Sequence, residues 1–153
     1  MPSPATSHEL HGALETFETC LLSPVVAGEL VSWAQAAQQA MQELLTHERL
    51  QLAAVHQQEF AEIARQDPDL STRVEQLQDE DGLIGQELLE TQQQLNDLVA
   101  AAEAAEPDEL RVETLRARVE ERGLSIVLRI RRQEAAARTW LVESFQRDRG
   151  DVD

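Results

Sequence analysis

The feature that most constrains the fold is a repeat of apolar residues at alternating spacings of three and four. This spacing places every member on one face of an α-helix. The cleanest run predicts a helix from about Asp69 to Glu103, and a carboxylate and a hydroxyl interrupt its apolar face. The run is Leu70, Val74, Leu77, Asp81, Ile84, Leu88, Thr91, Leu95, Leu98 and Ala102.

Three further stretches carry the same rhythm. The first predicts a short helix with its N-cap at Ser7, because Pro2 and Pro4 are poor helix formers and Ser23-Pro24 follows Leu22. The second begins after Gly28 and predicts either one helix to about Gln66 or a helix that bends near Gln57. The last predicts a helix from about Asp108 to Arg147. The apolar positions are Leu10, Leu14, Phe17 and Leu21; then Leu30, Ala34, Ala37, Met41, Leu44, Leu52 and Val55; then Val112, Leu115, Val119, Ile126, Ile130, Ala137 and Trp140, widened by Leu124, Val127, Leu128 and Leu141.

Composition and length agree with a single helical domain. Aromatic residues make up 3% of the 153 residues and tyrosine is absent, which disfavours a sheet. Short connections between long helices favour antiparallel neighbours. We therefore expect one all-α domain over residues 1–153, an up-down four-helix bundle of three long helices and a shorter N-terminal one. An acidic tail over 148–153 is expected to fray.

The net charge of −16 argues against nucleic acid and anionic membranes as partners. Residues 1–110 hold 3 Arg and 21 acidic residues, whereas residues 111–153 hold 10 Arg and 8 acidic residues. The last helix is therefore expected to dock on acidic neighbours. No apolar run is long enough to cross a bilayer, and the single Cys20 cannot form an internal disulfide. These observations predict a reduced, cytoplasmic protein.

Polar residues interrupt the apolar faces at similar depths. They are Glu48 and the nearby Gln51, Asp81, and Gln133. Mid-helix positions meet in an antiparallel bundle, so these four residues are expected to form one hydrogen-bonded core layer. Asp81 and Gln133 are the expected pair. Replacing Asp81 with Leu is then expected to be neutral or stabilising, as for other apolar replacements of buried polar groups.

Sequence motifs for catalysis or metal binding are missing. No His falls on the apolar faces, and His47 and His56 are expected on opposite sides of their helix. His8 and His11 are expected in solvent, and Cys20 has no His at a fixed helical offset. We therefore expect no enzymatic activity, no resident metal and no cofactor.

Two segments nevertheless resemble a known family. Asp67-Pro68-Asp69-Leu70 leading into RVEQLQDED, together with the ending RRQEAAARTWLVESFQRDRG, resembles bacterial hemerythrin-like proteins of the HHE cation-binding type. The similarity spans roughly residues 25–150. The resemblance implies a four-helix bundle that, in the family, holds a di-iron centre through His and carboxylate side chains.

The resemblance covers the framework of that family and not its metal ligands. Asp81 stands where members carry the His of an LRxEH turn. Gln133 and Ala137 stand where members carry the His and the last acid of RRHExxE, and the second helix offers Gln51 and Val55. These side chains do not supply the imidazoles that hold iron.

The sequence therefore predicts a non-catalytic, hemerythrin-like bundle without a di-iron site that acts as a binding or structural module. A protein partner, contacted through Trp33 or Trp140, and self-association both remain open. The alternative is a metal-binding or oxygen-sensing bundle with an altered ligand set, drawn from Glu48, His56, Glu59 and Asp81.

Overall fold

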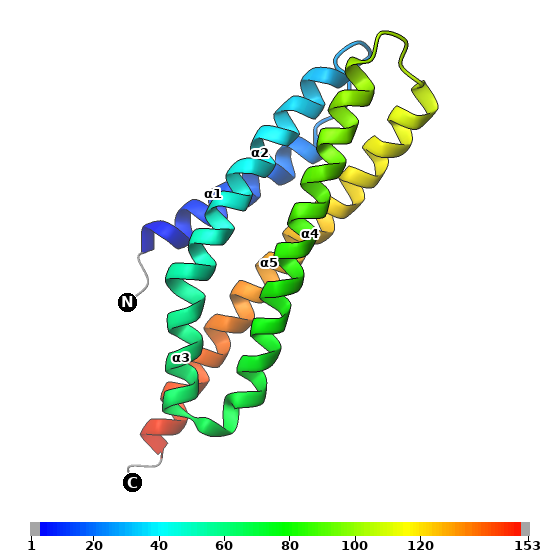
Figure 1. Cartoon of the computed structure of the whole chain (residues 1–153). Helices are drawn as coiled ribbons and strands as arrows, with labels where there is room; N and C mark the ends of the chain where they lie inside the picture. The colour runs from blue at the N-terminus through cyan, green and yellow to red at the C-terminus, as the bar shows by residue number, and fades with distance from the viewer. Residues whose placement is uncertain (1–3, 151–153) are drawn as a thin grey trace.

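The computed structural model describes residues 4–150, and the side chains of residues 8–147; within that range it is helical almost throughout and contains no strand. Two short segments interrupt the regular helices: a π-helical turn, η1, and a 3-10 turn, η2 (Figure 1). The elements are α1 (Pro4–Leu22), α2 (Leu30–Gln51), η1 (Leu52–His56), α3 (Gln57–Gln66), η2 (Pro68–Leu70), α4 (Ser71–Glu103) and α5 (Glu109–Gly150).

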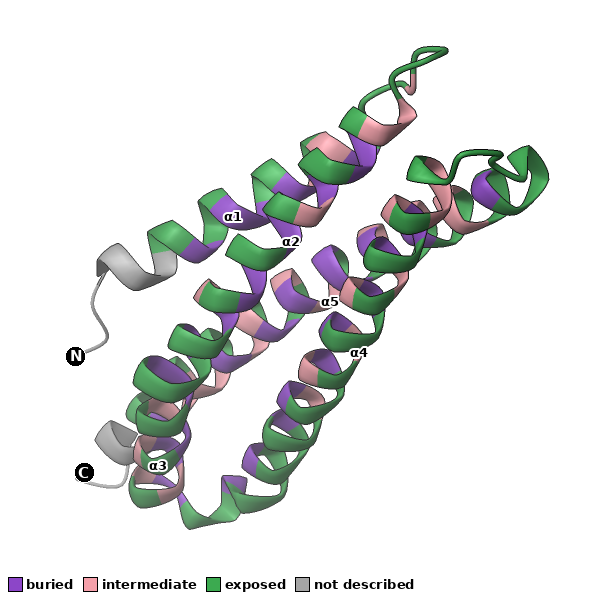
Figure 2. Ribbon diagram, turned by 45° about the horizontal axis from the view of Figure 1, so that its top comes forward, coloured by how far each residue is buried: buried purple, intermediate pink, exposed green. Residues whose placement is uncertain are grey.

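The helices pack along their length into an elongated bundle. Helix α1 lies against α2 and α5, α4 lies between α2 and α5, and α3 continues the line of α2 and packs against α5 and α4. Because α1 is short, it covers only the half of the bundle that contains α2, and α3 occupies the other half (Figure 1). The buried positions face the bundle interior (Figure 2).

The apolar side chains form two clusters that follow this division. The larger cluster joins α1, α2 and the adjoining halves of α4 and α5, with Phe17, Met41, Leu88 and Ile126 among its fully buried members. The smaller cluster joins α3 to the other ends of α4 and α5, around Ile63. The polar residues described below lie between the two clusters in sequence.

Helix α4 buries the apolar repeat that begins at Leu70. Every position of that repeat from Leu70 to Leu98 is buried, and Ala102 is half-buried. The helix follows η2, where the Asp67 side chain accepts a hydrogen bond of 3.1 Å from the backbone N–H of Asp69. Pro68 suits this first turn because its missing N–H is not needed there.

Two local predictions are wrong. Ser7 is not an N-cap, because α1 begins at Pro4, where a proline without an N–H is tolerated in the first turn. Leu128 is 48% exposed and does not widen the buried face of α5. The fraying expected of the tail over 148–153 stays a prediction: the backbone is helical to Gly150, and residues 151–153 lie outside the described part.

The π-helical turn changes the register of the second long helix. The backbone N–H of Gln57 donates to the carbonyl of Leu52, five residues earlier. One additional residue in a turn rotates the positions that follow by about 100°. Val55 and His56 are both buried, whereas Leu52, which the sequence placed on the apolar face, is exposed. The predicted break near Gln57 therefore takes the form of a π-helical turn that ends at His56.

Helices α1 and α5 approach each other closely at Gly123. A Cβ atom built on Gly123 would lie 2.5 Å from Cδ1 of Leu21 and 3.1 Å from the ring of Phe17. The absence of a side chain at this position lets the apolar face of α1 rest directly on the α5 backbone.

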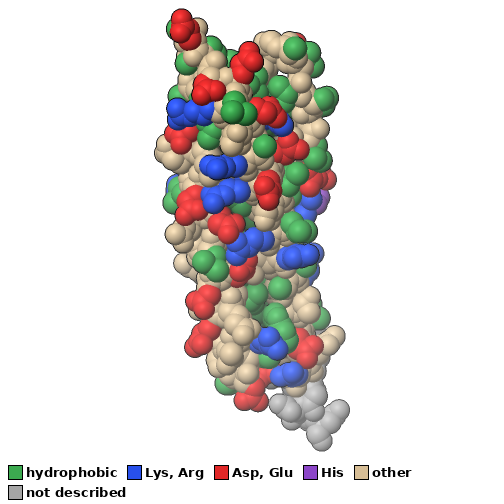
Figure 3. Space-filling model, turned by 90° about the vertical axis from the view of Figure 1, so that its right-hand side faces the viewer, with side chains coloured by type: hydrophobic (Ala, Val, Ile, Leu, Met, Phe, Trp, Pro, Cys, Tyr) green, Lys and Arg blue, Asp and Glu red, His purple; other side chains and the backbone are tan. Residues whose placement is uncertain are grey.

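The surface carries arginines interleaved with acidic side chains (Figure 3). Across α4 and α5, Arg129 pairs with both Glu80 and Glu87, and Arg122 lies 3.6 Å from Glu90. In the part of the chain that the structure describes, every helix is too short or too polar to cross a membrane.

Candidate functional site: a buried polar layer

The four polar residues singled out by the sequence are buried in the interior of the bundle. Glu48 and Gln51 come from α2, Asp81 from α4 and Gln133 from α5. Their exposed fractions are 5%, 1%, 5% and 4%, respectively. At such depths their polar atoms must find partners within the protein.

His56, in η1, is the centre of this layer. Its ring is fully buried, with Nδ1 2.8 Å from Oδ2 of Asp81 and Nε2 2.6 Å from Oε1 of Glu134. The expectation that no His falls on the apolar faces is therefore wrong. A continuous α-helix would direct His56 elsewhere, and the π-helical turn brings it inward beside Val55.

Two glutamine amides complete the layer. Nε2 of Gln133 donates to Oδ1 of Asp81 at 2.9 Å and to the carbonyl of Leu77 at 2.7 Å. Nε2 of Gln51 donates to Oε2 of Glu134 at 2.8 Å. Each carboxylate therefore has one oxygen facing His56 and the other facing an amide, so the layer ties together α2, η1, α4 and α5.

The two carboxylates keep His56 charged. Burial by itself would lower the pKa of His56, but the contacts with Asp81 and Glu134 outweigh it and raise the pKa to about 10. At neutral pH both ring nitrogens therefore carry protons; Nδ1 donates to Asp81, and Nε2 forms an ion pair with Glu134. The centre of the layer then holds one positive and two negative charges.

Glu48 lies beside this charged group in its protonated form. Burial, reinforced by the negative charges of Glu134 and Asp81, raises the pKa of Glu48 to about 8, although the positive charge of His56 acts in the opposite direction. Its Oε2 atom makes no hydrogen bond with any residue that the structure describes. Glu48 thus adds a neutral carboxyl to the layer at neutral pH.

Glu59, on α3, stands at the margin of the layer. It is half-buried, and burial together with the charge of Glu134 raises its pKa, while the charges of His56 and Arg138 oppose this shift. Carboxyl groups from α2, α3, α4 and α5 therefore all face a single imidazole.

The layer does not fit the di-iron centre that the family resemblance implies. It offers one imidazole, and both nitrogens of that ring face carboxylates within hydrogen-bonding distance. Gln133, at a position where the family has His, presents its amide nitrogen to Asp81, and a protonated amide nitrogen cannot bind a cation. Among the described residues, no group of three or more His, Cys, Asp or Glu is placed to hold a metal ion.

Sequence reasoning missed Glu134 as well as His56. Glu134 lies seven residues after Val127, which belongs to the widened apolar face of α5, and this spacing could have indicated it. No comparable sequence signal exists for His56, because its burial depends on the π-helical turn.

The remaining residues considered from the sequence lie apart from the layer. His11 pairs with Glu15 at 3.3 Å in solvent, and Cys20 is a half-buried free thiol. Trp33 is 8% exposed, and its Nε1 donates to the carbonyl of Ser23 at 3.1 Å.

Trp140 is half-buried, and the guanidinium of Arg73 stacks over it at 5.0 Å from the ring centroid. Neither tryptophan therefore presents a large exposed ring to a partner.

No family model, curated protein or solved structure matches this chain, so the hemerythrin-like resemblance depends on its own residues alone.

Proposed function

We propose that this protein is a non-catalytic, hemerythrin-like helical bundle that acts as a binding or structural module. In this proposal the position of the family's metal centre is taken by a hydrogen-bonded polar layer. The observation that carries the proposal is the mutual engagement of His56 with Asp81 and Glu134 at 2.8 and 2.6 Å.

The same contacts argue for a structural role of the layer. Both oxygens of Asp81 make hydrogen bonds, with His56 and Gln133, and Glu134 accepts one from Gln51 and forms an ion pair with His56. Contacts of this kind between helices restrict how the helices can pair. An up-down order is supported by the neighbour relations of α1 with α2, α2 with α4, and α4 with α5.

Elemental analysis of untagged protein, purified without chelator, tests this proposal. We expect less than a tenth of an equivalent of iron, zinc or manganese, together with cooperative thermal unfolding. A stoichiometric metal that is lost in His56→Gln and kept in the control His11→Ala would contradict the proposal, because it would place the metal in the layer.

The alternative function is metal binding or oxygen sensing through Glu48, His56, Glu59 and Asp81. The observation in its favour is that the charge of His56 reaches both Glu48 and Glu59, and that one oxygen of Glu48 lacks a hydrogen-bond partner among the described residues. Metal binding would require His56 to exchange a carboxylate neighbour for the cation. The metal analysis above separates the two functions.

Our proposal extends to the cellular setting of the protein. The single Cys20, a free thiol, fits a reducing cytoplasm.

No nucleophile paired with a base supports catalysis in the described part of the chain. A protein partner or a second copy would have to bind on the outer surface, because the ring of His56 at the centre of the layer is fully buried.

A further inference from the structure

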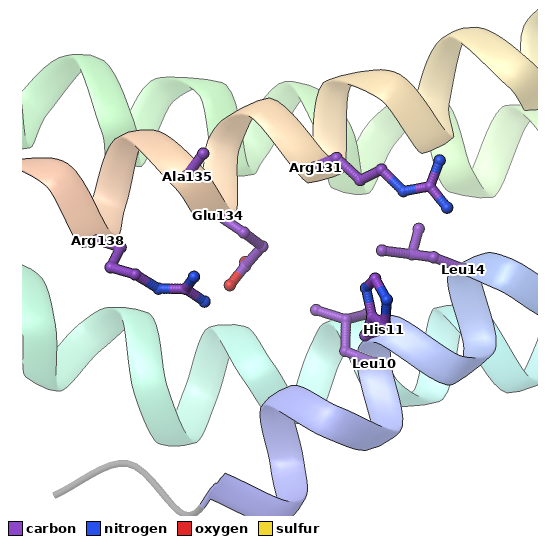
Figure 4. Close-up of a pocket in the computed structure, with 7 residues that line it drawn as sticks. All are labelled: Leu10, His11, Leu14, Arg131, Glu134, Ala135 and Arg138. Carbon is purple, nitrogen blue, oxygen red and sulfur yellow. The ribbon is translucent and has the colours of Figure 1, made fainter.

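A pocket opens between α1 and α5, next to the buried layer. Its volume is about 180 Å³. Figure 4 shows side chains from both helices around it. The lining residues are Leu10, His11 and Leu14 from α1, and Arg131, Glu134, Ala135 and Arg138 from α5. The pocket therefore combines apolar side chains with two guanidinium groups.

The two arginines have different surroundings. Arg131 and Arg138 are seven residues apart and share one face of α5. Arg131 is held by Glu18 of α1, with Nη1 2.7 Å from Oε2. Arg138 makes no hydrogen bond or ion pair with any other residue that the structure describes, although its charge reaches Glu59. Arg138 is the cation of the pocket that a ligand can pair with.

The carboxylate of Glu134 has partners in the buried layer. Its Oε1 lies 2.6 Å from Nε2 of His56, and its Oε2 accepts a hydrogen bond from Gln51. Leu14 and Ala135 give the pocket an apolar wall beside the guanidinium of Arg138.

We infer that this pocket binds a small aliphatic monocarboxylate. The carboxylate would pair with the fork of Arg138, which matches its planar geometry, and the chain would lie against Leu14 and Ala135. The pocket is small for a ligand site, which limits the ligand to a short chain of about four to six carbons. The inference rests on the proposed role of the bundle as a binding module, and it specifies short aliphatic monocarboxylates as the ligands.

A phosphate is a poorer match for the same site. Of the two guanidinium groups that line the pocket, Arg131 is paired with Glu18, so only Arg138 can pair with a ligand. The protein as a whole carries a net charge of −16, so a dianion meets more repulsion than a monoanion. A phosphate also has no hydrocarbon chain to cover the apolar wall. An affinity that increases with the length of the hydrocarbon chain would therefore distinguish a carboxylate site from a phosphate site.

The test is an NMR titration of the full chain with acetate, butanoate, hexanoate and inorganic phosphate at constant pH and ionic strength. We expect saturable shifts around residues 131–138, with a dissociation constant on the order of millimolar for hexanoate. Each added methylene should tighten binding about three- to fourfold until the pocket is full. Phosphate should bind at least tenfold more weakly than hexanoate.

Two variants test the site, and one is a control. Arg138→Gln should weaken hexanoate binding at least tenfold, and Ala135→Leu should abolish it by filling the pocket without altering the charge. Arg118→Gln, on an exposed part of α5 remote from the pocket, should bind as the parent does. All three positions are exposed, so folding is not at risk, and thermal melts verify it.

Unchanged binding in Arg138→Gln, no dependence on chain length, or phosphate binding as tight as hexanoate would each overturn the inference. These outcomes are independent of the metal analysis. Metal-free protein that binds no carboxylate would leave the proposed polar layer intact. Metal-loaded protein that binds hexanoate through Arg138 would contradict the polar-layer proposal and support the pocket.

Discussion

The Nδ1 atom of His56 lies 2.8 Å from Oδ2 of Asp81, which joins a π-helical turn to the middle of the longest apolar repeat. Both side chains are almost fully buried, so water cannot replace either partner. The contact couples the position of η1 to that of α4, and most of the expected behaviour of the core follows from it.

Replacing Asp81 with Leu is expected to lower the free energy of unfolding by about 3–5 kcal/mol, because the substitution leaves a buried charged imidazole with one carboxylate. This reverses the expectation drawn from the sequence, in which Asp81 had only the neutral Gln133 as its partner. Urea unfolding measures the change. Asp79→Leu, at an exposed position on the same helix, is the control and should change stability little. An Asp81→Leu variant as stable as the parent would contradict the charged pair.

His56→Leu should destabilise the protein to a similar extent, since it leaves Asp81 and Glu134 buried without their cation. The double variant with Asp81→Leu should lose less stability than the sum of the two single changes, because the residues form one pair. A double-mutant cycle should give a coupling energy of about 1–3 kcal/mol. Strict additivity would show that the two side chains stabilise the fold independently.

Stability is expected to fall as the pH rises through neutrality. Glu48 loses its proton near its ordinary value of 4.5 in the unfolded chain but near 8 in the folded protein, so folding is progressively penalised between these values. His56 contributes stability that is complete below its ordinary value of 6.5 and is lost as the pH approaches about 10. Each group changes the unfolding free energy by at most about 1.4 kcal/mol per pH unit.

Thermal melts between pH 5.5 and pH 9.5 measure this dependence. In Glu48→Gln the melting temperature should fall less steeply with pH below about pH 8. The decrease in melting temperature that comes from deprotonation of His56 should persist. A melting temperature that rises steadily from pH 6 to pH 9 would be incompatible with the raised pKa values.

Gly123→Ala should destabilise the protein by about 1–3 kcal/mol, because its new methyl group would overlap the side chain of Leu21 and force α1 away from α5. Gly85→Ala is the matched control: it lies within α4, and a methyl group added there would meet no atom within 4 Å. That change should stabilise by up to about 1 kcal/mol through helix propensity alone. Chemical denaturation of both variants tests the contrast, and equal effects would argue against a close approach at Gly123.

The sequence was sufficient to predict the helical fold class and the buried face of α4, because both depend on a spacing that the chain displays directly. It also indicated the depth of Glu48, Asp81 and Gln133, which interrupt that spacing. The central His56 could not be predicted, because its direction depends on the hydrogen-bonding pattern of a single turn. Without that histidine, the charge state of the layer could not be deduced either.

The extra residue in the turn from Leu52 to His56 also has a topological consequence. Counted along a regular α-helix, the residues that α3 buries are shifted by about one residue from those that α2 buries. The π-helical turn absorbs this residue, so both segments present their buried faces to the bundle interior and one rod of helix lines both cores. A single-residue deletion within this turn would leave a regular spacing of three and four, and an ordinary α-helix could then line both cores without the turn.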